Sequence, residues 1–357
     1  MKIKKKIYRF KEISSPEEFV PALTKGVKDV ETVIDRLQFL SINDIPVSFL
    51  DVMHTKNKFL KLKYYFNFKR VMLLVKLLIL KDKEIFLNYP FIKGRLFDYV
   101  IENVVINRNN VSLLVHDVYS LQMSNINFEQ LKKEIKIFNR AKRIIFHNNK
   151  MVDLLKKYGL SHENYMTIDI FDYIINDKIF QSRNFSNKII FAGNIAKANF
   201  LKEFRFLKKF GFILNLYGPN YKKEELDFKN ISYKGILDPE EIVHKMDGSF
   251  GLIWDGDSIK TCTGNYGEYL KYNNPFKFSM YIAAGIPVIC WKNSAIANFI
   301  EINKIGFCID KIEDINNLLN ELNEEKYQNI RANVIKLGMK LRTGYNTENA
   351  IKEIYNL

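Results

Sequence analysis

The chain has 357 residues, of which 47% are hydrophobic and 27% are charged, and it carries a formal net charge of +15. This composition excludes an intrinsically disordered protein, and the length favours two domains that each bury a core. The longest apolar runs are too short to cross a bilayer, no signal-peptide stretch follows the basic start, and the three cysteines lack metal-type spacing. We therefore expect a cytoplasmic protein with an anionic partner, although a Lys- and Asn-rich genome would also produce part of this charge.

The first half of the chain alternates strand-like apolar runs with helical patterns. Strands are expected at residues 5–10, 84–89, 111–115 and 143–146. Helices are expected after the cap at Ser14-Ser15, at residues 66–80, along the stripe of Phe128, Leu131, Ile135 and Phe138, and after the cap at Asn148-Asn149. The run at residues 66–80 is apolar almost all round, which predicts a helix buried on every side. Strands alternating with helices predict an α/β fold with a doubly wound parallel sheet.

A polar, turn-rich break at residues 176–187 precedes a restart of the same pattern. Strands are expected at residues 188–191, 212–217, 231–234 and 250–254, and helices at residues 199–209 and from Asp238. We therefore predict two Rossmann-like domains, at residues 1–183 and 184–340. Residues 341–357 contain a last helix that can pack back on the first domain.

The stretch at residues 263–290 predicts a ligand site at the start of a helix. Asn274 suits the N-cap and Pro275 the first helical position. Lys277 then lies in the first turn, where a cation opposes the helix dipole. An anion bound at this helix start would explain the lysine, whereas the alternative is an ordinary capped helix.

Three loops follow expected strands at the same edge of the second sheet: Gly193-Asn194, Tyr217-Gly218-Pro219 and Asp255-Gly256-Asp257. Ligands of open α/β sheets bind outside the carboxyl ends of the strands. Each loop alone has a composition that is common in turns, but together with residues 274–277 the three loops indicate one site. The sequence lacks the P-loop motif and a G-x-G-x-x-G after the first strand, which argues against a P-loop NTPase and a dinucleotide cofactor.

The run at residues 251–289, with FAGN, LNLYGP and SYKGIL before it, resembles bacterial GT-B glycosyltransferases. Within them it is similar to the β-1,6-galactofuranosyltransferases of polysaccharide assembly and to the glucosyltransferases that act on serine-rich adhesins. NYP at 88–90, VHD at 115–117, FHNNKM at 146–151 and IFDY at 170–173 extend the resemblance to the first half. The resemblance implies two Rossmann-like domains that face a cleft, with a nucleotide sugar on the C-terminal domain and the acceptor against the N-terminal one.

The resemblance also implies which residues surround the donor. These are Gly193, Asn194 and Lys197 at the sugar-phosphate side, Tyr217 with Gly218 by the base or ribose, and Asn274, Pro275 and Lys277 at the diphosphate. Phe276 departs from the pattern, because a histidine is usual there in the relatives. A polar role for this position is therefore not expected.

The mechanism implied by the resemblance is inverting and metal-independent. The positions at which retaining relatives carry two glutamates hold Tyr272 and Met280 here, and neither side chain can act as a carboxylate. An inverting transfer needs a base, for which Asp117 is the first candidate and Glu268 in the Gly-rich loop the second. The alternative for Asp117 is a carboxylate that caps the turn after its strand. Asp255-Gly256-Asp257 looks like a metal motif but is interpreted as a turn, so that Lys277 and the helix start supply the positive charge.

Residues 128–157 contain nine Lys or Arg against three acidic residues. Five of the basic residues lie off the apolar stripe of the expected helix: Lys132, Lys133, Lys136, Arg140 and Arg143. Such a run is commonly a solvated face. The alternative is a peripheral contact with an anionic membrane, at whose inner face lipid-linked acceptors reside.

We therefore expect a transferase that moves galactofuranose or glucose from a UDP-sugar to a glycan, lipid-linked or glycoprotein acceptor, without a further cofactor. The sequence is also compatible with a homo-oligomer. One alternative is a non-catalytic GT-B protein that acts as partner or chaperone of another transferase. A basic nucleic-acid-binding protein is a weaker alternative, because the lysines are spread along the chain and no RNA- or DNA-binding module is present.

Overall fold

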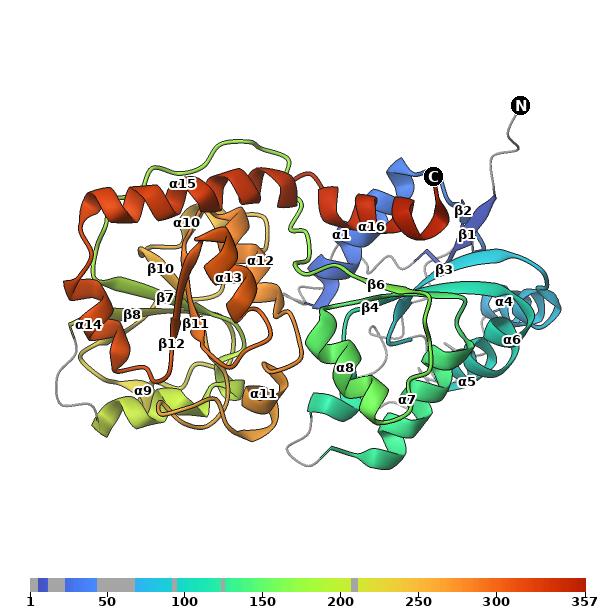
Figure 1. The fold of residues 1–357 in the computed structure, drawn as a ribbon, viewed down its shortest axis with the longest axis horizontal. Helices are drawn as coiled ribbons and strands as arrows, with labels where there is room; N and C mark the ends of the chain where they lie inside the picture. The colour runs from blue at the N-terminus through green and yellow to red at the C-terminus, as the bar shows by residue number, and fades with distance from the viewer. Residues whose placement is uncertain (1–5, 12–22, 44–67, 92–94, 123–125, 207–210) are drawn as a thin grey trace.

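The computed structural model describes residues 6–11, 23–43, 68–91, 95–122, 126–206 and 211–357. It contains two six-stranded sheets, one in each half of the chain, which lie side by side with helices around them (Figure 1). The strand orders are β2-β1-β3-β4-β5-β6 and β12-β11-β10-β7-β8-β9, and the described strand pairs are parallel. The predicted α/β architecture with two doubly wound sheets is confirmed, and the cap expected at Ser14-Ser15 lies outside the described residues.

The first sheet is built from the N-terminal half of the chain. Its strands are β1 (Ile7–Arg9), β2 (Leu40–Ser41), β3 (Glu84–Tyr89), β4 (Asn110–Val115), β5 (Arg143–Phe146) and β6 (Tyr165–Thr167). The accompanying α-helices are α1 (Leu23–Arg36), α4 (Phe68–Ile79), α5 (Arg95–Val100), α6 (Ile106–Arg108), α7 (Phe128–Arg140) and α8 (Asn149–Lys157), with a π-helix η1 (Ile101–Val105) and a 3₁₀ helix η2 (Tyr119–Gln122). Asn148 caps α8, as expected, because its side chain accepts the Met151 N–H at 3.0 Å.

The second sheet is built from the C-terminal half. Its strands are β7 (Lys188–Ala192), β8 (Ile213–Tyr217), β9 (Ile231–Tyr233), β10 (Phe250–Ile253), β11 (Val288–Trp291) and β12 (Gly306–Ile309). The helices are α9 (Lys223–Leu226), α10 (Ile242–Lys245), α11 (Gly264–Tyr269), α12 (Phe276–Ala283), α13 (Ala297–Asn303), α14 (Asp314–Asn320), α15 (Glu324–Leu341) and α16 (Tyr345–Tyr355), with 3₁₀ helices η3 (Ile195–Lys197) and η4 (Asn199–Phe206). The segment expected as a helix at residues 199–209 thus takes the 3₁₀ form over its described part.

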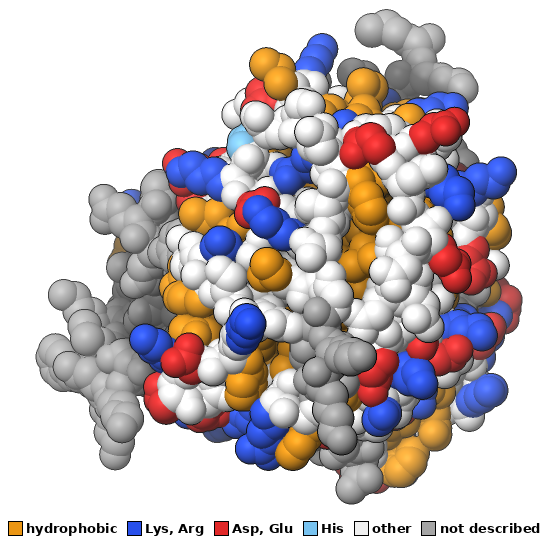
Figure 2. Space-filling model, turned by 90° about the vertical axis from the view of Figure 1, so that its left-hand side faces the viewer, with side chains coloured by type: hydrophobic (Ala, Val, Ile, Leu, Met, Phe, Trp, Pro, Cys, Tyr) orange, Lys and Arg blue, Asp and Glu red, His pale blue; other side chains and the backbone are white. Residues whose placement is uncertain are grey.

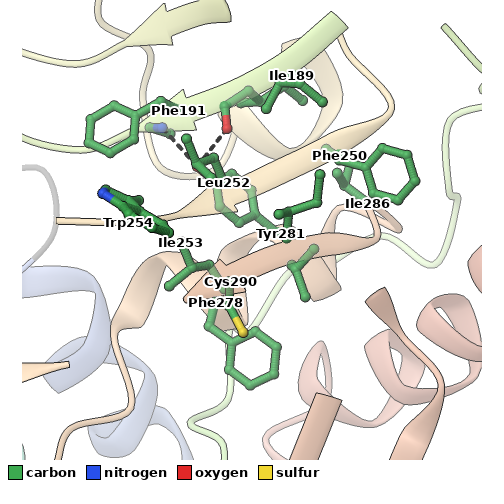
Figure 3. Close-up of a cluster of buried hydrophobic side chains, with 14 of the residues drawn as sticks. Ile189, Phe191, Phe250, Leu252, Ile253, Trp254, Phe278, Tyr281, Ile286 and Cys290 are labelled. Carbon is green, nitrogen blue, oxygen red and sulfur yellow. Dashed lines mark hydrogen bonds between the residues drawn. The ribbon is translucent and has the colours of Figure 1, made fainter. Parts of the chain in front are cut away.

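A cluster of buried side chains joins α12 to the second sheet (Figure 3). Tyr281 of α12 lies across Gly251 of β10, where a Cβ would stand 2.4 Å from the tyrosine ring. Its hydroxyl accepts the Ala192 N–H at 2.8 Å and donates to the Ile190 carbonyl at 3.3 Å. Because the phenol is fully buried, these bonds hold α12 in one position over β7 and β10.

Helix α4 differs from the expectation of burial on every side. Only Leu73 and Leu77 are buried along it, whereas Phe68 and Ile79 are 76% and 73% exposed. An apolar sequence indicates a helix that can be buried. Which faces of the helix are buried depends on how many other elements pack against it. The expectation is therefore wrong for residues 68–79.

The last helix, α16, returns to the first domain. Ala350, Ile351 and Tyr355 belong to a buried cluster that includes residues of α1 and β3. Asp172 accepts the N–H groups of Asn346 and Thr347 at 3.2 and 2.6 Å, which satisfies free donors at the start of α16. The C-terminus consequently lies beside the first sheet (Figure 1). No helix within the described ranges has the length and hydropathy needed to cross a bilayer.

Candidate active site

A cleft with a volume of about 480 Å³ is lined by residues from both halves of the chain. Its walls come from the loops after β4, β7, β8 and β10 and from the first turn of α12. Eight of the residues expected at the site line it: Asp117, Gly193, Asn194, Lys197, Tyr217, Gly218, Pro275 and Lys277. Asn274 and Glu268 do not.

The loops after β7 and β8 touch each other through glycine. Gly218 has a φ of +133°, and a Cβ on it would stand 1.9 Å from the Gly193 carbonyl oxygen. Only glycine allows this approach, so the two loops form one continuous edge. Asn194 fixes the first of them, because its side chain accepts the Ala196 N–H at 3.1 Å and the Asn220 amide at 2.8 Å.

Tyr217 lines the cleft at the carboxyl end of β8. Its side chain is almost fully buried in the second core, and its hydroxyl accepts the Asp247 N–H at 2.9 Å. The ring is therefore committed to the domain interior. The side chains of Ile236, Leu237 and Ile242 add apolar lining to the same cleft.

Among the described residues, Lys277 and Lys197 are the lysines that line the cleft. The Lys277 ammonium lies 2.8 Å from the Asp255 carboxylate and 4.5 Å from the centre of the Phe191 ring. Asp255 thus supplies an anion beside the first turn of α12, where the sequence predicts the anion of a ligand. Lys197 is exposed, and its ammonium lies 4.4 Å from the Tyr266 ring centre. The described residues give it no carboxylate partner within ion-pair distance.

Asn274 is buried between the domains and does not cap α12. The cap residue is Pro275, and the helix begins at Phe276, so the positions expected for Asn274 and Pro275 are wrong by one residue. The Asn274 side-chain amide donates to the carbonyls of His147 and Asp169 at 2.7 and 2.8 Å, and its oxygen accepts from Asn148 at 2.7 Å. These bonds use its donors and acceptor, which is why it cannot also cap the helix.

His147 completes this junction. Its Nδ1 accepts the Asn274 N–H at 3.0 Å, and its Nε2 lies 3.0 Å from the His116 carbonyl. Burial, together with the neighbouring His116, lowers the pKa of His147 to about 3, so the imidazole stays neutral and Nδ1 remains an acceptor. Burial also lowers the pKa of His116 to about 4.

Asp117 lies at the carboxyl end of β4, facing the second domain. Its Oδ1 accepts the Tyr269 hydroxyl at 3.2 Å. Burial raises the pKa of Asp117 to about 6, while hydrogen bonds from Tyr269 and Gln122 and the charge of Lys197 oppose that rise. A carboxylate with this pKa is ionised at neutral pH and can accept a proton from a hydroxyl group.

Two further residues at this site are not predicted by the sequence patterns. Tyr269 belongs to the second half of the chain but bonds to Asp117 in the first. Glu134 of α7 is fully buried and accepts the N–H groups of Tyr119 and Ser120 at 3.0 and 3.1 Å, which holds the loop after Asp117. Glu134 offered a signal, because a carboxylate three residues after Leu131 falls on the apolar stripe of α7.

The remaining acidic candidates are occupied elsewhere. Glu268 forms an ion pair with Lys271. Asp257 accepts the Asn199 amide at 2.9 Å, and Gly256 between the aspartates has a φ of +98° in a turn that closes on Thr263. Within the described residues, no group of three or more His, Cys, Asp and Glu side chains is arranged to hold a metal ion.

The structure also places Met280, Tyr272 and the basic residues of the segment 128–157. Met280 lines the cleft, whereas Tyr272 packs against the core of the first domain. Lys132, Lys133 and Lys136 are exposed on α7, but Arg143 lies on β5 and pairs with Glu84 at 2.9 Å. Arg143 is therefore not part of an exposed basic face. On the face shown in Figure 2, basic and acidic side chains are interspersed, which is not the pattern of a nucleic-acid-binding stripe.

Two models of one protein family match the chain. The N-terminal domain of the glucosyltransferase 3-like proteins matches residues 21–170, and their C-terminal domain matches residues 189–354. The β-1,6-galactofuranosyltransferase WbbI of Escherichia coli (strain K12) is 33% identical over 216 residues, which cover 59% of this chain and 62% of the relative. The match thus spans less than two thirds of that relative. Glucosyltransferase 3 of Streptococcus parasanguinis is 26% identical over 243 residues, or 68% of this chain and 69% of the relative.

Solved structures share the fold over nearly the whole chain. HepE from Anabaena, in complex with UDP and glucose, superposes with a TM-score of 0.58 at 11% identity and covers 99% of both chains. Sucrose-phosphate synthase from Thermosynechococcus elongatus also gives a TM-score of 0.58 at 11% identity and covers 99% of this chain and 98% of that one. Both have the GT-B fold, and at such identity the likeness concerns the fold alone.

Proposed function

The chain belongs to the glucosyltransferase 3-like family of glycosyltransferases, and from that premise we propose that it transfers a hexosyl group from a UDP-sugar to a glycan acceptor. The observation that carries this proposal is the pair of opposed walls in one cleft. One wall carries Lys197 and Lys277 beside the abutting loops of Gly193 and Gly218, and the other carries Asp117. Cations on one side and a carboxylate on the other suit a transfer in which a diphosphate leaves and a hydroxyl loses its proton.

In the proposed reaction, the acceptor oxygen attacks the anomeric carbon of the donor sugar. The bond between that carbon and the β-phosphate oxygen breaks, and Asp117 takes the hydroxyl proton. UDP leaves with the electron pair and an added negative charge. Lys197 is the more available cation for this charge, because Asp255 already balances part of the charge of Lys277.

Inversion of the anomeric configuration follows from a direct displacement, and Met280 in the cleft is consistent with it. A double displacement would need a carboxylate nucleophile, and the Met280 thioether cannot fill that part. Metal independence is part of the same proposal. The two lysines supply the charge that a divalent cation would otherwise contribute.

The names of the relatives support galactofuranose and glucose as donor sugars, and we propose UDP-galactofuranose first and UDP-glucose second. The acceptor class proposed is a glycan in lipid-linked or glycoprotein form, in bacterial polysaccharide or glycoprotein assembly. We also propose that the protein attaches peripherally to the inner face of the membrane through the exposed lysines of α7. Each lysine adds on the order of 1 kcal/mol of attraction near an anionic surface.

The test is a transfer assay with each UDP-sugar and a panel of lipid-linked and peptide-linked acceptors, followed by proton NMR of the product. The expected product has the β configuration when the donor is α-linked. An α-glycoside would contradict inversion. UDP binding without transfer to any acceptor would favour a non-catalytic partner of another transferase.

A further inference from the structure

We infer that Tyr269 is a positioning residue: its phenol reaches across from the donor-binding domain and holds the Asp117 carboxylate in the orientation that receives the acceptor proton. This inference rests on the proposed function, because it takes Asp117 to be the base. It assigns to the Gly-rich segment before α12 a part in proton transfer, beside its proximity to the donor loops.

The contact between Tyr269 and Asp117 has a defined direction. The phenol oxygen accepts the N–H of Val118 at 3.1 Å and lies 3.2 Å from Asp117 Oδ1. Since a phenol has a single proton and the carboxylate can only accept, that proton points to Oδ1. One hydroxyl therefore binds both the side chain of Asp117 and the backbone of the next residue.

The position of Tyr269 in the fold shows that this contact crosses the domain boundary. The residue ends α11, after β10 of the second sheet, but its ring is 3% exposed and packs in the core of the first domain. A side chain buried in this way keeps one rotamer, so the hydroxyl stays where the loop after β4 meets it. The orientation of Asp117 consequently depends on how the two domains meet.

A second tyrosine of α11, Tyr266, faces the donor side of the cleft. Tyr266 lines the cleft, and the Lys197 ammonium lies 4.4 Å from the centre of its ring. One short helix thus carries both a residue against the donor-side cation and a residue that holds the base. Only two residues of α11 separate Tyr266, which contacts Lys197, from Tyr269, which contacts Asp117.

The groups that face Asp117 determine the sign of the expected pH effect. They are Tyr269 from α11, Lys197 from η3, Glu134 from α7, and Tyr119 with Gln122 from η2. Burial is the largest influence and raises the pKa of Asp117, Glu134 raises it further, and the bonds from Tyr269 and Gln122 with the charge of Lys197 lower it. Loss of the phenolic proton therefore raises the pKa of Asp117, and the acid limb of the rate profile moves to higher pH.

The experiment replaces Tyr269 by Phe in the full chain and measures kcat against pH and the affinity for UDP. We expect kcat near neutral pH to fall about tenfold or more, the scale for a lost hydrogen bond to a charged group. The acid limb should move to higher pH, and UDP affinity should stay unchanged. Incorporation of 3-fluorotyrosine at position 269, a stronger donor, should move the limb to lower pH, and it provides the test if the Phe variant does not fold.

Tyr272→Phe is the matched control. Tyr272 also packs against the first core, and its hydroxyl makes no hydrogen bond within the described part of the chain. A Tyr269→Phe protein with the wild-type pH profile would overturn the inference, and so would a loss of kcat without a shift of the limb. A separate variant tests the proposed function itself. Normal turnover of an Asp117→Asn protein would show that Asp117 is not the base, independently of the result for Tyr269.

Discussion

The two walls of the cleft are built in different ways. The donor wall is held within one domain: Gly218 abuts Gly193, Lys277 pairs with Asp255, and Tyr281 fixes α12 to the sheet behind them. The opposite wall depends on the junction between domains, where Asp117 bonds to a tyrosine from the other half of the chain. If the proposed roles hold, variants of the donor wall should mainly change UDP binding, whereas variants at the domain junction should mainly change turnover, because only the position of Asp117 requires contact between both domains.

The largest effect should come from the loss of the base. Asp117→Asn keeps the shape of the side chain but removes its ability to accept the proton, and general bases contribute about 10²–10⁴-fold to rates. We expect turnover to fall by that range while UDP still raises the melting temperature as in the wild type. In the wild type, turnover should decline as the pH falls below about 6, because protonation of Asp117 removes the base. Near-normal turnover of the variant would show that Asp117 is not the base and that the wall opposite the donor wall does not carry out proton transfer.

Lys277→Ala tests the donor wall. Turnover should fall by about 10²-fold, the scale for the loss of one charge-stabilising donor, and the UDP-induced rise in melting temperature should shrink. The free protein should also lose stability, because the half-buried Asp255 is left without its partner, at a cost of about 1–3 kcal/mol. The helix dipole alone would predict the opposite change in stability, because removal of a cation from the first turn of a helix should stabilise the helix.

Asp255→Asn is the control for the lysine variant. If Lys277 serves the diphosphate, this variant should retain or improve UDP binding, since it frees the ammonium while keeping the shape of the side chain. Equal loss of turnover in both variants, with UDP binding intact, would mean that the ion pair is only structural.

Asn274→Ala should affect the domain junction and leave the donor wall intact. It removes three side-chain hydrogen bonds from a buried junction and leaves the Asp169 carbonyl without the amide that donates to it, so the free energy of unfolding should fall by about 1–3 kcal/mol in chemical denaturation. The dissociation constant for UDP should change little. Asn273→Ala, at the preceding residue, is the stability control and should lower the free energy of unfolding by less. A large loss of UDP affinity in the Asn274 variant would return this residue to the donor site.

The smallest effect should follow chelation. If the lysines carry the charge of the leaving diphosphate, EDTA should leave the transfer rate essentially unchanged. Activity that disappears with EDTA and returns with Mn²⁺ would contradict the metal-independent mechanism.

The second-domain side of the cleft could largely be predicted from the sequence, because its features are local. A glycine after an apolar strand, as at Gly193 and Gly218, indicates both the turn and the sheet edge where it lies. The partner of each side chain was not predictable in the same way. Asp255 is 22 residues before Lys277, and their ion pair depends on how a long loop folds back.

The wall that carries Asp117 depends more strongly on contacts that the sequence does not predict. Asp117 could be proposed from its place at the end of a strand, but Tyr269 follows it by 152 residues. Asn274 was assigned to a cap because asparagine before a helix usually caps it. Contacts with His147 and Asp169 override that local preference, and only the packing of the two domains shows this.

Calorimetric titration measures whether the donor wall binds the diphosphate of a uridine nucleotide, as we propose. UDP should bind the free protein with one site per chain. Uridine, which lacks the diphosphate, should bind at least tenfold more weakly, and Lys277→Ala should reduce the difference between them. Equal affinity for UDP and uridine, or no detectable binding of UDP, would contradict the account.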